Sequence, residues 1–358
     1  LRAIIYEANR ALSSAYAAEQ PPEDILRATD RAFLELQRRK TASRMRAIAE
    51  SANGIFARLE WRVANRGRLV GVETGFASIN ELTLGWRKKD YILIASSPSV
   101  GKTTFALNSG MAAALAGEHV AVFSYEMRRE QLEDRLLSTL TRIPFYRIES
   151  GTFGQADYKQ ISEALEVMHE LQLSIDDRAG QYVSDIRNTC RRMQSETGLG
   201  LVIIDYVQLV PSEMSRRGAN RNEQLTEISR SLKELADELD VPVMVLSQLK
   251  RVDPRRPDPR PQLDDLRDSG SLEQDADEVN FLHRRNHKES GTTNYIREKA
   301  RNGPTGTRNL TIDRDTVTFT DGGEDPPEPA EKPRRTGKGR KLAPDPSPDI
   351  PFTPPEED

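Results

Sequence analysis

Residues 91–104 read Tyr91-Ile-Leu-Ile-Ala-Ser-Ser-Pro-Ser-Val-Gly-Lys-Thr-Thr104, and this stretch decides the fold. An apolar run typical of a strand leads into a loop of small residues, and an apolar segment typical of a helix follows. Gly101 lets backbone amides turn toward a phosphate, and the helix start adds the positive end of its dipole. The stretch therefore predicts a phosphate-binding loop (P-loop), although Ser96 stands where the general pattern has glycine.

The side chains of the predicted P-loop have expected roles in nucleotide binding. We expect Lys102 to reach the β- and γ-phosphates of a nucleotide and Thr103 to bind Mg²⁺. ATP and Mg²⁺ are therefore the expected cofactors. The predicted nucleotide-binding residues of the loop are Ser97, Pro98, Ser99, Val100, Gly101, Lys102, Thr103 and Thr104.

A second nucleotide-binding motif is predicted at residues 201–205. Leu201-Val-Ile-Ile-Asp205 is an apolar run that ends in a carboxylate. We expect Asp205 to hold Mg²⁺ through its water shell, as a second ligand beside the P-loop threonine. The alternative is that Asp205 only caps the following turn, and the neighbouring P-loop disfavours it.

Hydrolysis also needs a group that orients and deprotonates water. Glu126 follows the apolar run Val120–Ser124, at the sheet edge where ligands bind, and is the best candidate for the general base. Gln248 follows the run Val241–Leu246 and could contact the γ-phosphate or the attacking water. By spacing alone, Glu126 could equally stabilise a helix start and Gln248 could be an ordinary polar strand end.

Apolar runs alternate with amphipathic helices over much of the chain. This alternation predicts an α/β fold with a mostly parallel central sheet covered on both faces. After Tyr295 the pattern changes to short alternating runs, which predict a terminal antiparallel meander. The predicted strands are Tyr91–Ala95, Val120–Ser124, Leu171–Ile175, Leu201–Ile204, Val241–Leu246, Glu278–His283, Asn294–Arg301, Leu310–Asp313 and Val317–Phe319.

The flanking segments differ in composition from the central region. Residues 1–68 show helical periodicity but contain too few large apolar residues for a complete globular domain. Residues 321–358 are dense in Pro and charged residues, which predicts a disordered tail. No apolar run is long enough to cross a membrane, and the single cysteine, Cys190, fits a reducing compartment. We therefore expect a cytoplasmic protein without a membrane partner.

Together these motifs resemble the DnaB family of replicative helicases, over about residues 70–320. The matching stretches, which follow the family's order, are Gly71–Phe76, Pro98–Thr103, Phe123–Met127, Ile204–Leu209, Glu227–Lys233, Pro242–Leu249, Asp265–Asp277 and Lys299–Gly306. The resemblance implies a RecA-like P-loop NTPase fold. It also implies that residues 1–40 are the end of a helical N-terminal domain, mostly absent here, that 41–68 form a linker helix, and that 69–320 form the ATPase domain.

The resemblance implies further roles. Glu126 matches the family's catalytic glutamate, and Gln248 matches its phosphate-sensing glutamine. Lys299 and Arg301 match a basic pair that reaches into the neighbouring subunit's nucleotide; without the family, they would be expected to be solubilising charges on an exposed strand. Two loops match those that line the family's DNA channel, and their predicted DNA-binding residues are Arg216, Arg217, Arg221, Arg267, Asp268 and Gly270. Ordinary surface charge is the alternative for the first three.

The expected function is that of an ATP-dependent replicative DNA helicase, a homohexameric ring that moves 5′ to 3′ on single-stranded DNA and unwinds forked DNA. Primase and a helicase loader are the further partners that the family implies. The net charge of -4 does not by itself indicate a nucleic-acid binder, so the DNA-contacting cations must be concentrated locally. The alternatives are a RecA-like ATPase of recombination or signalling, and a catalytically idle DNA-binding or loading module.

Overall fold

The computed structural model describes residues 2–17, 21–40, 48–64, 66–217, 219–249, 256, 260–284 and 291–322. The predicted disordered tail lies outside the described residues from position 323 onward. The first part of the predicted linker, residues 41–47, also lies outside them.

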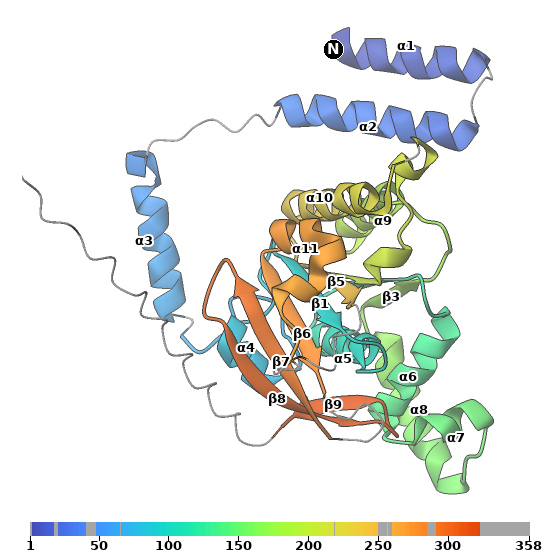
Figure 1. The fold of residues 1–358 in the computed structure, drawn as a ribbon, viewed down its shortest axis with the longest axis vertical. Helices are drawn as coiled ribbons and strands as arrows, with labels where there is room; N and C mark the ends of the chain where they lie inside the picture. Colours follow the sequence, from blue (N-terminus) through green and yellow to red (C-terminus); the bar gives the residue numbers. More distant parts are fainter. Residues whose placement is uncertain are drawn as a thin grey trace, which may run out of the picture. The chain divides into compact units, whose positions relative to one another are not determined.

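Within the described residues, nine strands form one mixed sheet in the order β3-β2-β4-β5-β1-β6-β7-β8-β9. The first six of these are parallel, and β7 to β9 continue the sheet as an antiparallel meander (Figure 1). The predicted α/β class with a mostly parallel central sheet is therefore confirmed. The strands are β1 (Tyr91–Ser96), β2 (Val120–Ser124), β3 (Leu173–Asp176), β4 (Leu201–Asp205), β5 (Val243–Gln248), β6 (Glu278–His283), β7 (Gly291–Ala300), β8 (Gly306–Asp313) and β9 (Thr318–Asp321).

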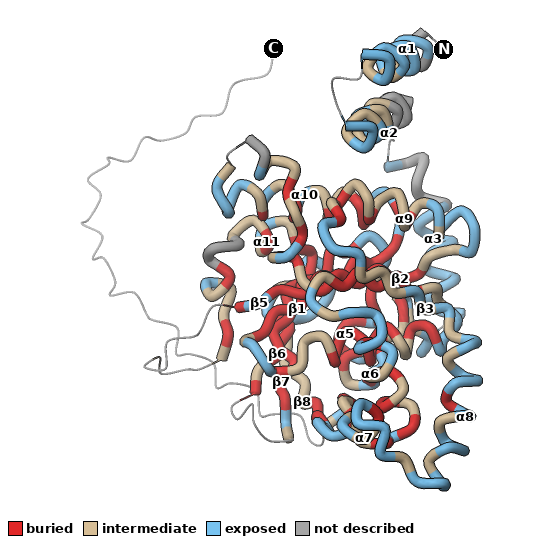
Figure 2. The backbone as a smooth tube through the Cα atoms, turned by 90° about the vertical axis from the view of Figure 1, so that its right-hand side faces the viewer, coloured by how far each residue is buried: buried red, intermediate tan, exposed pale blue. Residues whose placement is uncertain are grey.

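Helices cover both faces of this sheet. In Figures 1 and 2, α9, α10 and α11 lie on one side and α5 lies on the other. Residues of α4 pack in the same core cluster as α5. The helices of the described residues are α1 (Arg2–Ala17), α2 (Pro22–Lys40), α3 (Ile48–Ala64), α4 (Ala77–Thr83), α5 (Lys102–Leu115), α6 (Arg129–Thr141), α7 (Phe145–Ser150), α8 (Gln155–Glu170), α9 (Val183–Glu196), α10 (Arg221–Leu239) and α11 (Gly270–Asp275), with the 3-10 turns η1 (Val207–Leu209), η2 (Glu213–Arg217) and η3 (Leu263–Ser269).

The central strand β1 divides its side chains between two cores. Leu93 packs in the cluster formed with α9 and α10, whereas Ile92 and Ile94 pack in the cluster formed with α4 and α5. All three are fully buried, because side chains of a strand alternate between the faces of a sheet and both faces are covered here. Figure 2 shows this as a continuous buried layer along the strands. An uninterrupted apolar strand leading into the P-loop therefore fixes the loop at the centre of the sheet.

Strand boundaries differ from prediction where local backbone chemistry intervenes. β3 begins at Leu173 rather than Leu171, because Leu171 is the C-cap residue of α8 and donates its N–H to Val167 O. β5 begins at Val243, just after Pro242, which has no N–H to donate to a neighbouring strand. β9 begins at Thr318 because Val317 has a positive φ of 46° and belongs to the turn. The strand ends at Asp321, one residue beyond the predicted boundary of the ATPase domain.

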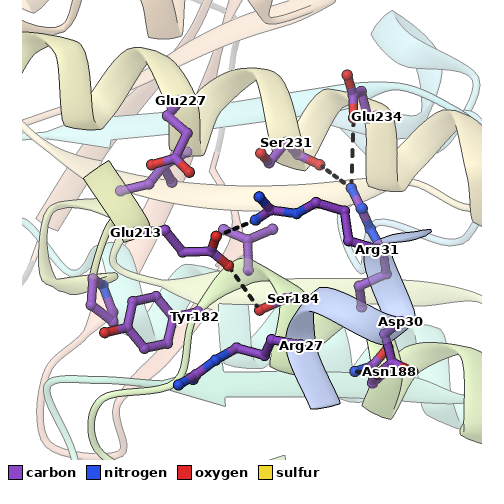
Figure 3. Close-up of a pocket in the computed structure, with 14 residues that line it drawn as sticks. Arg27, Asp30, Arg31, Tyr182, Ser184, Asn188, Glu213, Glu227, Ser231 and Glu234 are labelled. Atoms are coloured by element: carbon purple, nitrogen blue, oxygen red, sulfur yellow. Dashed lines mark hydrogen bonds and ion pairs between the residues drawn. The ribbon is translucent and has the colours of Figure 1, made fainter. Parts of the chain in front are cut away.

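The N-terminal helices contact the ATPase core through polar side chains of α2. Asp30 accepts a 3.0 Å hydrogen bond from Asn188 of α9, and Arg31 forms an ion pair with Glu213 of η2 (Figure 3). The guanidinium of Arg27 lies 4.9 Å from the ring centre of Tyr182. These contacts border a cavity of about 320 Å³ whose lining includes no P-loop residue. Among the described side chains of α2, these contacts with the core are therefore a hydrogen bond, an ion pair and a cation–π contact.

Helix α3 exposes large apolar side chains to solvent. Ile55, Phe56, Leu59 and Val63 are all exposed, with 42%, 62%, 50% and 74% of their surface accessible. Their spacing places them along one side of the helix. Within the described residues, no helix has the length and apolarity that a membrane crossing requires.

Candidate nucleotide-binding site

The P-loop connects β1 to α5 through a residue that must be glycine. Gly101 has a φ of +109°, and a Cβ there would lie 3.0 Å from Cδ1 of Ile312 and 3.1 Å from the ring of Phe319. Both the left-handed backbone and the close packing of the meander therefore require glycine. Helix α5 begins at Lys102, and no side chain caps its N-terminus. Its first-turn N–H groups are thus available to an anion, as the sequence predicts.

The P-loop is also held by a side chain that follows β6, the strand next to β1. Ser97 is half-buried, whereas Pro98 and Ser99 are exposed and Val100 is buried. The Ser99 carbonyl accepts a 3.2 Å hydrogen bond from Arg284, a buried side chain just after β6. A neighbouring strand therefore helps to fix the loop, which the sequence did not predict.

The two predicted Mg²⁺ ligands lie next to each other. Thr103 Oγ1 donates a 2.6 Å hydrogen bond to Oδ2 of Asp205, at the end of β4. The Asp205 side chain is buried, and its Oδ1 has no hydrogen-bond partner among the described residues. Burial raises the pKa of this carboxyl, although Lys102 and the hydrogen bond from Thr103 act in the opposite direction. A buried carboxylate oxygen without a donor is what a divalent cation would stabilise.

The composition of this pair fits Mg²⁺. Oxygen ligands from one or two side chains, completed by water and phosphate, are typical of Mg²⁺ sites in nucleotide-hydrolysing proteins. No group of three or more His, Cys, Asp or Glu side chains able to hold a metal occurs among the described residues. The pair Thr103 and Asp205 therefore suits an ion that is bound jointly with a nucleotide.

Lys102 lies close to Asp205 and Glu126. Its ammonium nitrogen is 4.6 Å from the ring centre of Tyr206. Burial lowers the pKa of Lys102, and the negative charges of Asp205 and Glu126 only partly oppose this effect. The pKa values of Lys102 and Asp205 thus both shift toward the neutral forms, because burial outweighs the attraction between them. A polyphosphate would supply the negative charge that favours the charged lysine.

Glu126 lies close to Asp205. It is exposed and comes two residues after Ser124, which pairs with Asp205 across β2 and β4. Its charge is close enough to raise the pKa of Asp205. Helix α6 begins only at Arg129 and has its own first-turn carboxylate, Glu130, so Glu126 does not lie in the first turn of that helix.

Gln248 lies at the same edge of the sheet. It is the last residue of β5 and is exposed, and it pairs in register with Ser96, which leads into the P-loop. Its backbone N–H donates to Oε1 of Gln208 at 3.3 Å, and Gln208 in turn donates to Ser247 at 2.9 Å. The parallel strands therefore bring Gln248 toward the phosphate side, as the sequence predicts.

Lys299 and Arg301 are not brought to this pocket. Lys299 pairs with Val279 near the start of β6, and Arg301 donates its N–H to the carbonyl of Asp277. These positions lie at the amino end of β1, whereas the P-loop follows its carboxyl end. Six strand residues separate the two ends by about 17 Å. The two cations therefore lie at the amino end of β1, and the nucleotide loop of their own chain lies at its carboxyl end.

The predicted DNA-binding residues occupy two separate segments. Arg221 begins α10 and donates to Gln208 O at 2.5 Å. Gly270 begins α11 with a helical φ of −53°, and a Cβ there would meet nothing within 4 Å. Arg216 and Arg217 belong to η2, and Arg267 and Asp268 belong to η3; their side chains lie outside what the structure describes.

The structure adds side chains that the sequence did not indicate. Arg135 of α6 lies close enough to Asp205 and Glu126 for their charges to favour its charged form, although burial lowers its pKa. Its guanidinium lies 5.1 Å from the ring centre of Phe145. Tyr206 directly follows the predicted metal ligand, which is the only signal that could have found it. Arg135 has no comparable signal, because its position depends on how α6 packs.

Cys190 plays no part in this pocket. It is buried in the core cluster on the α9 side of the sheet, and burial raises its pKa to about 12. The thiol is therefore protonated at neutral pH, which does not suit a nucleophile.

Solved structures resemble this fold closely. One, described as an ATPase domain, has a TM-score of 0.72 and 33% sequence identity, covering 78% of this chain and 99% of that chain. Another, described as "The Structure Of A DnaB-Like Replicative Helicase And Its Interactions With Primase", has a TM-score of 0.77 and 30% identity. It covers 89% of this chain and 75% of that chain.

Sequence relatives agree with the structural neighbours. The chain is 38% identical over 325 residues to "Replicative DNA helicase DnaC" of Bacillus subtilis (strain 168) and to "Replicative DNA helicase DnaB" of Geobacillus stearothermophilus. Each alignment covers 89% of this chain and 71% of the relative. Residues 71–321 match the family described as DnaB-like helicase C terminal domain. With the phosphate loop and strand order in place, these matches show that the chain belongs to the DnaB-like helicase family.

Proposed function

We propose that this chain is an ATP-hydrolysing replicative DNA helicase that works as a homohexameric ring. The observation that carries the proposal is a nucleotide pocket whose cis groups lie at one end of β1 while Lys299 and Arg301 lie at the other. A pocket divided in this way is completed when a second copy presents its cations to the P-loop of the first. Nucleotide hydrolysis would thus depend on assembly.

We propose a separate role in ATP hydrolysis for each of these groups. Lys102 and the α5 amides orient the triphosphate. Thr103 and Asp205 would hold Mg²⁺, which would supply positive charge beside the phosphates. Glu126 accepts a proton from the water that attacks the γ-phosphorus, and ADP and inorganic phosphate leave. Arg301 and Lys299 of the adjoining subunit stabilise the charge that develops on the transferred phosphoryl group.

The remaining segments suit a ring. We propose that α3, within the linker at residues 41–68, docks its exposed apolar side on a neighbouring subunit, which would remove four large apolar side chains from water. Residues 1–40 are proposed to be the end of an N-terminal helical domain, and residues 69–320 the motor.

We propose single-stranded DNA of a replication fork as the substrate strand. Arg216, Arg217, Arg221, Arg267, Asp268 and Gly270 are the proposed contacts in the ring channel, where cations can neutralise backbone phosphates. Gln248 is proposed to sense the γ-phosphate. Primase and a helicase loader are the proposed partners, and the cytoplasm is the proposed location; one structural neighbour is described with primase.

Fork unwinding by three proteins tests the function: wild type, Lys102→Ala and Arg301→Ala. Substrates with only a 5′ or only a 3′ single-stranded tail give the polarity, and we expect unwinding from the 5′ tail alone. Each variant should lose both ATPase and unwinding by itself. A mixture of the two should regain ATPase, because the intact P-loop of the Arg301 variant then meets an intact arginine from the Lys102 variant.

Three results would oppose the proposal. A wild-type protein that hydrolyses ATP with DNA but separates no strands would point to a RecA-like recombination or signalling ATPase. A protein that binds forked DNA without hydrolysing ATP would be an idle DNA-binding or loading module. Mixtures that stay inactive would contradict the assignment of Arg301 to the neighbouring site.

A further inference from the structure

Asp277 connects the ATPase core to Arg301 through its two carboxylate oxygens. Its side chain is buried just before β6, with 6% of its surface accessible. Oδ2 accepts hydrogen bonds from the backbone N–H of Tyr91, at 2.8 Å, and from Lys233 Nζ, at 2.7 Å. Oδ1 faces the other way and lies 3.1 Å from a terminal nitrogen of Arg301. One oxygen is therefore bound to the scaffold, and the other holds the arginine.

The backbone strengthens this arrangement. The Asp277 N–H donates to the carbonyl of Tyr91 at 2.9 Å, and the Asp277 carbonyl accepts from the N–H of Arg301 at 2.8 Å. Asp277 is thus fixed to the first residue of β1, and Arg301 is fixed to Asp277 by both main chain and side chain. The Arg301 side chain remains half exposed, with 51% of its surface accessible, so part of its guanidinium faces solvent.

Lys299 is held beside it by the end of α11. Its Nζ donates to the carbonyl of Glu273 at 2.5 Å and lies 3.4 Å from the carbonyl of Gln274. Arg301 donates to the same Gln274 carbonyl at 3.2 Å. Carbonyl groups at a helix end carry partial negative charge. They and Asp277 offset the repulsion between two cations that would otherwise separate.

We propose that Asp277 is a positioning residue that aims Arg301, with Lys299 beside it, at the nucleotide of the adjoining subunit. This inference rests on the proposed function, because it requires that Arg301 acts in trans. Transition-state stabilisation by a cation depends on its placement before the reaction, and a half-exposed arginine without its carboxylate would sample many rotamers. Asp277 is not proposed to touch the nucleotide itself.

Asp277→Asn separates the two roles of the carboxylate. The amide oxygen of asparagine can still accept from Tyr91 and Lys233, whereas its NH₂ group then faces Arg301 and repels it. Lys233→Met is the matched control. It removes the other charged partner of the same carboxylate and leaves the contact between Oδ1 and Arg301 in place.

We expect the full-length Asp277→Asn protein to lose ATPase kcat with forked DNA by on the order of 10²-fold, because small misplacement of a reacting group has effects of this size. Its KM for ATP should change by less than about threefold, because the groups that bind ATP lie in the other subunit. Lys233→Met should keep kcat within about twofold of wild type, even if its melting temperature falls by as much as that of Asp277→Asn. Size measurements with ATP and Mg²⁺ establish that both variants assemble.

Mixing distinguishes a trans defect from a local one. Asp277→Asn combined with Lys102→Ala should regain ATPase, because the intact P-loop of the first then receives a correctly held arginine from the second. Should this mixture stay inactive while Arg301→Ala with Lys102→Ala recovers, the role of Asp277 is refuted and the proposed function stands. Should neither mixture recover, the trans assignment itself fails.

A second variant covers failure of the first to assemble. Asp277→Glu keeps the charge but is longer by one methylene, so it displaces Arg301 without leaving it unpaired. A fall in kcat of more than about tenfold at unchanged KM would support the positioning role. An Asp277→Glu or Asp277→Asn ring with wild-type kcat would overturn it.

Discussion

The hydroxyl of Thr103 donates a 2.6 Å hydrogen bond to Oδ2 of Asp205, which joins the P-loop helix to the end of β4 across 102 positions of sequence. The same carboxylate leaves its Oδ1 buried without a hydrogen-bond partner among the described residues. Asp205 is therefore only half satisfied by the protein. The geometry prepares it for a cation that arrives with the nucleotide.

Replacing Thr103 by valine tests this relationship. Thr103→Val has nearly the same shape but loses both the donor to Asp205 and the proposed Mg²⁺ ligand. We expect the affinity for Mg²⁺-nucleotide to fall at least about tenfold, measured by Mg²⁺ titration of nucleotide binding. The nucleotide-free protein should lose about 1–3 kcal/mol in denaturant unfolding, because a buried carboxylate loses its donor. Thr103→Ser retains the hydroxyl and should behave as wild type; equal defects in both variants would refute the explanation.

Glu126→Gln separates hydrolysis from binding. Glutamine has the shape of glutamate but cannot accept the proton of water. We expect kcat to fall by about 10²- to 10⁴-fold, the usual contribution of a general base. Nucleotide affinity should change little, since Lys102 and the α5 amides are untouched. Single-turnover hydrolysis and equilibrium nucleotide binding measure the two quantities; unchanged hydrolysis would exclude Glu126 as the base.

Asp90 predicts a pH dependence of stability. Burial, followed by the charges of Glu278 and Asp277, raises its pKa from 3.8 to about 7. The folded protein therefore holds a proton that the unfolded chain releases above pH 3.8. Its contribution to stability is complete below that pH and declines by about 1.4 kcal/mol per pH unit until about pH 7.

Asp90→Asn imitates the protonated form at every pH. Relative to this variant, the wild type should lose stability between about pH 4 and about pH 7, as followed by denaturant unfolding at several pH values. The difference between the two proteins isolates Asp90 from other titrating groups. A pH-independent difference would show that Asp90 does not retain its proton on folding.

The buried ion pair of Arg297 and Glu278 predicts a stability effect that is not additive. Arg297 is fully buried and also donates to the carbonyls of Asn302 and Pro304, at 3.0 and 2.8 Å. Arg297→Met should cost about 3–5 kcal/mol, because it leaves an unpaired buried carboxylate. Adding Glu278→Leu should recover part of this loss in chemical unfolding. A double variant that is less stable than the sum of the single changes would contradict this account.

Local sequence determined the elements that depend on short-range chemistry. The apolar run Tyr91–Ser96 and the glycine at 101 predict a buried strand and a left-handed turn, and the structure contains both. Apolar strands are recognisable because they are buried on both faces of the sheet. Parallel strands also present their carboxyl ends together, so Asp205, Glu126 and Gln248 could be placed at one edge without knowing the strand order.

Strand order and helix packing decided what the sequence left open. Arg135 reaches the neighbourhood of Asp205 only because α6 packs as it does, and no residue spacing encodes that approach. The antiparallel return of β7 beside β6 puts Arg301 at the amino end of β1, next to Asp277. Periodicity reports which face of an element is buried, whereas it carries no information about which distant element covers that face. The sequence alone therefore determined the nucleotide loop, and the tertiary structure decided that this loop and Arg301 lie at opposite ends of the sheet.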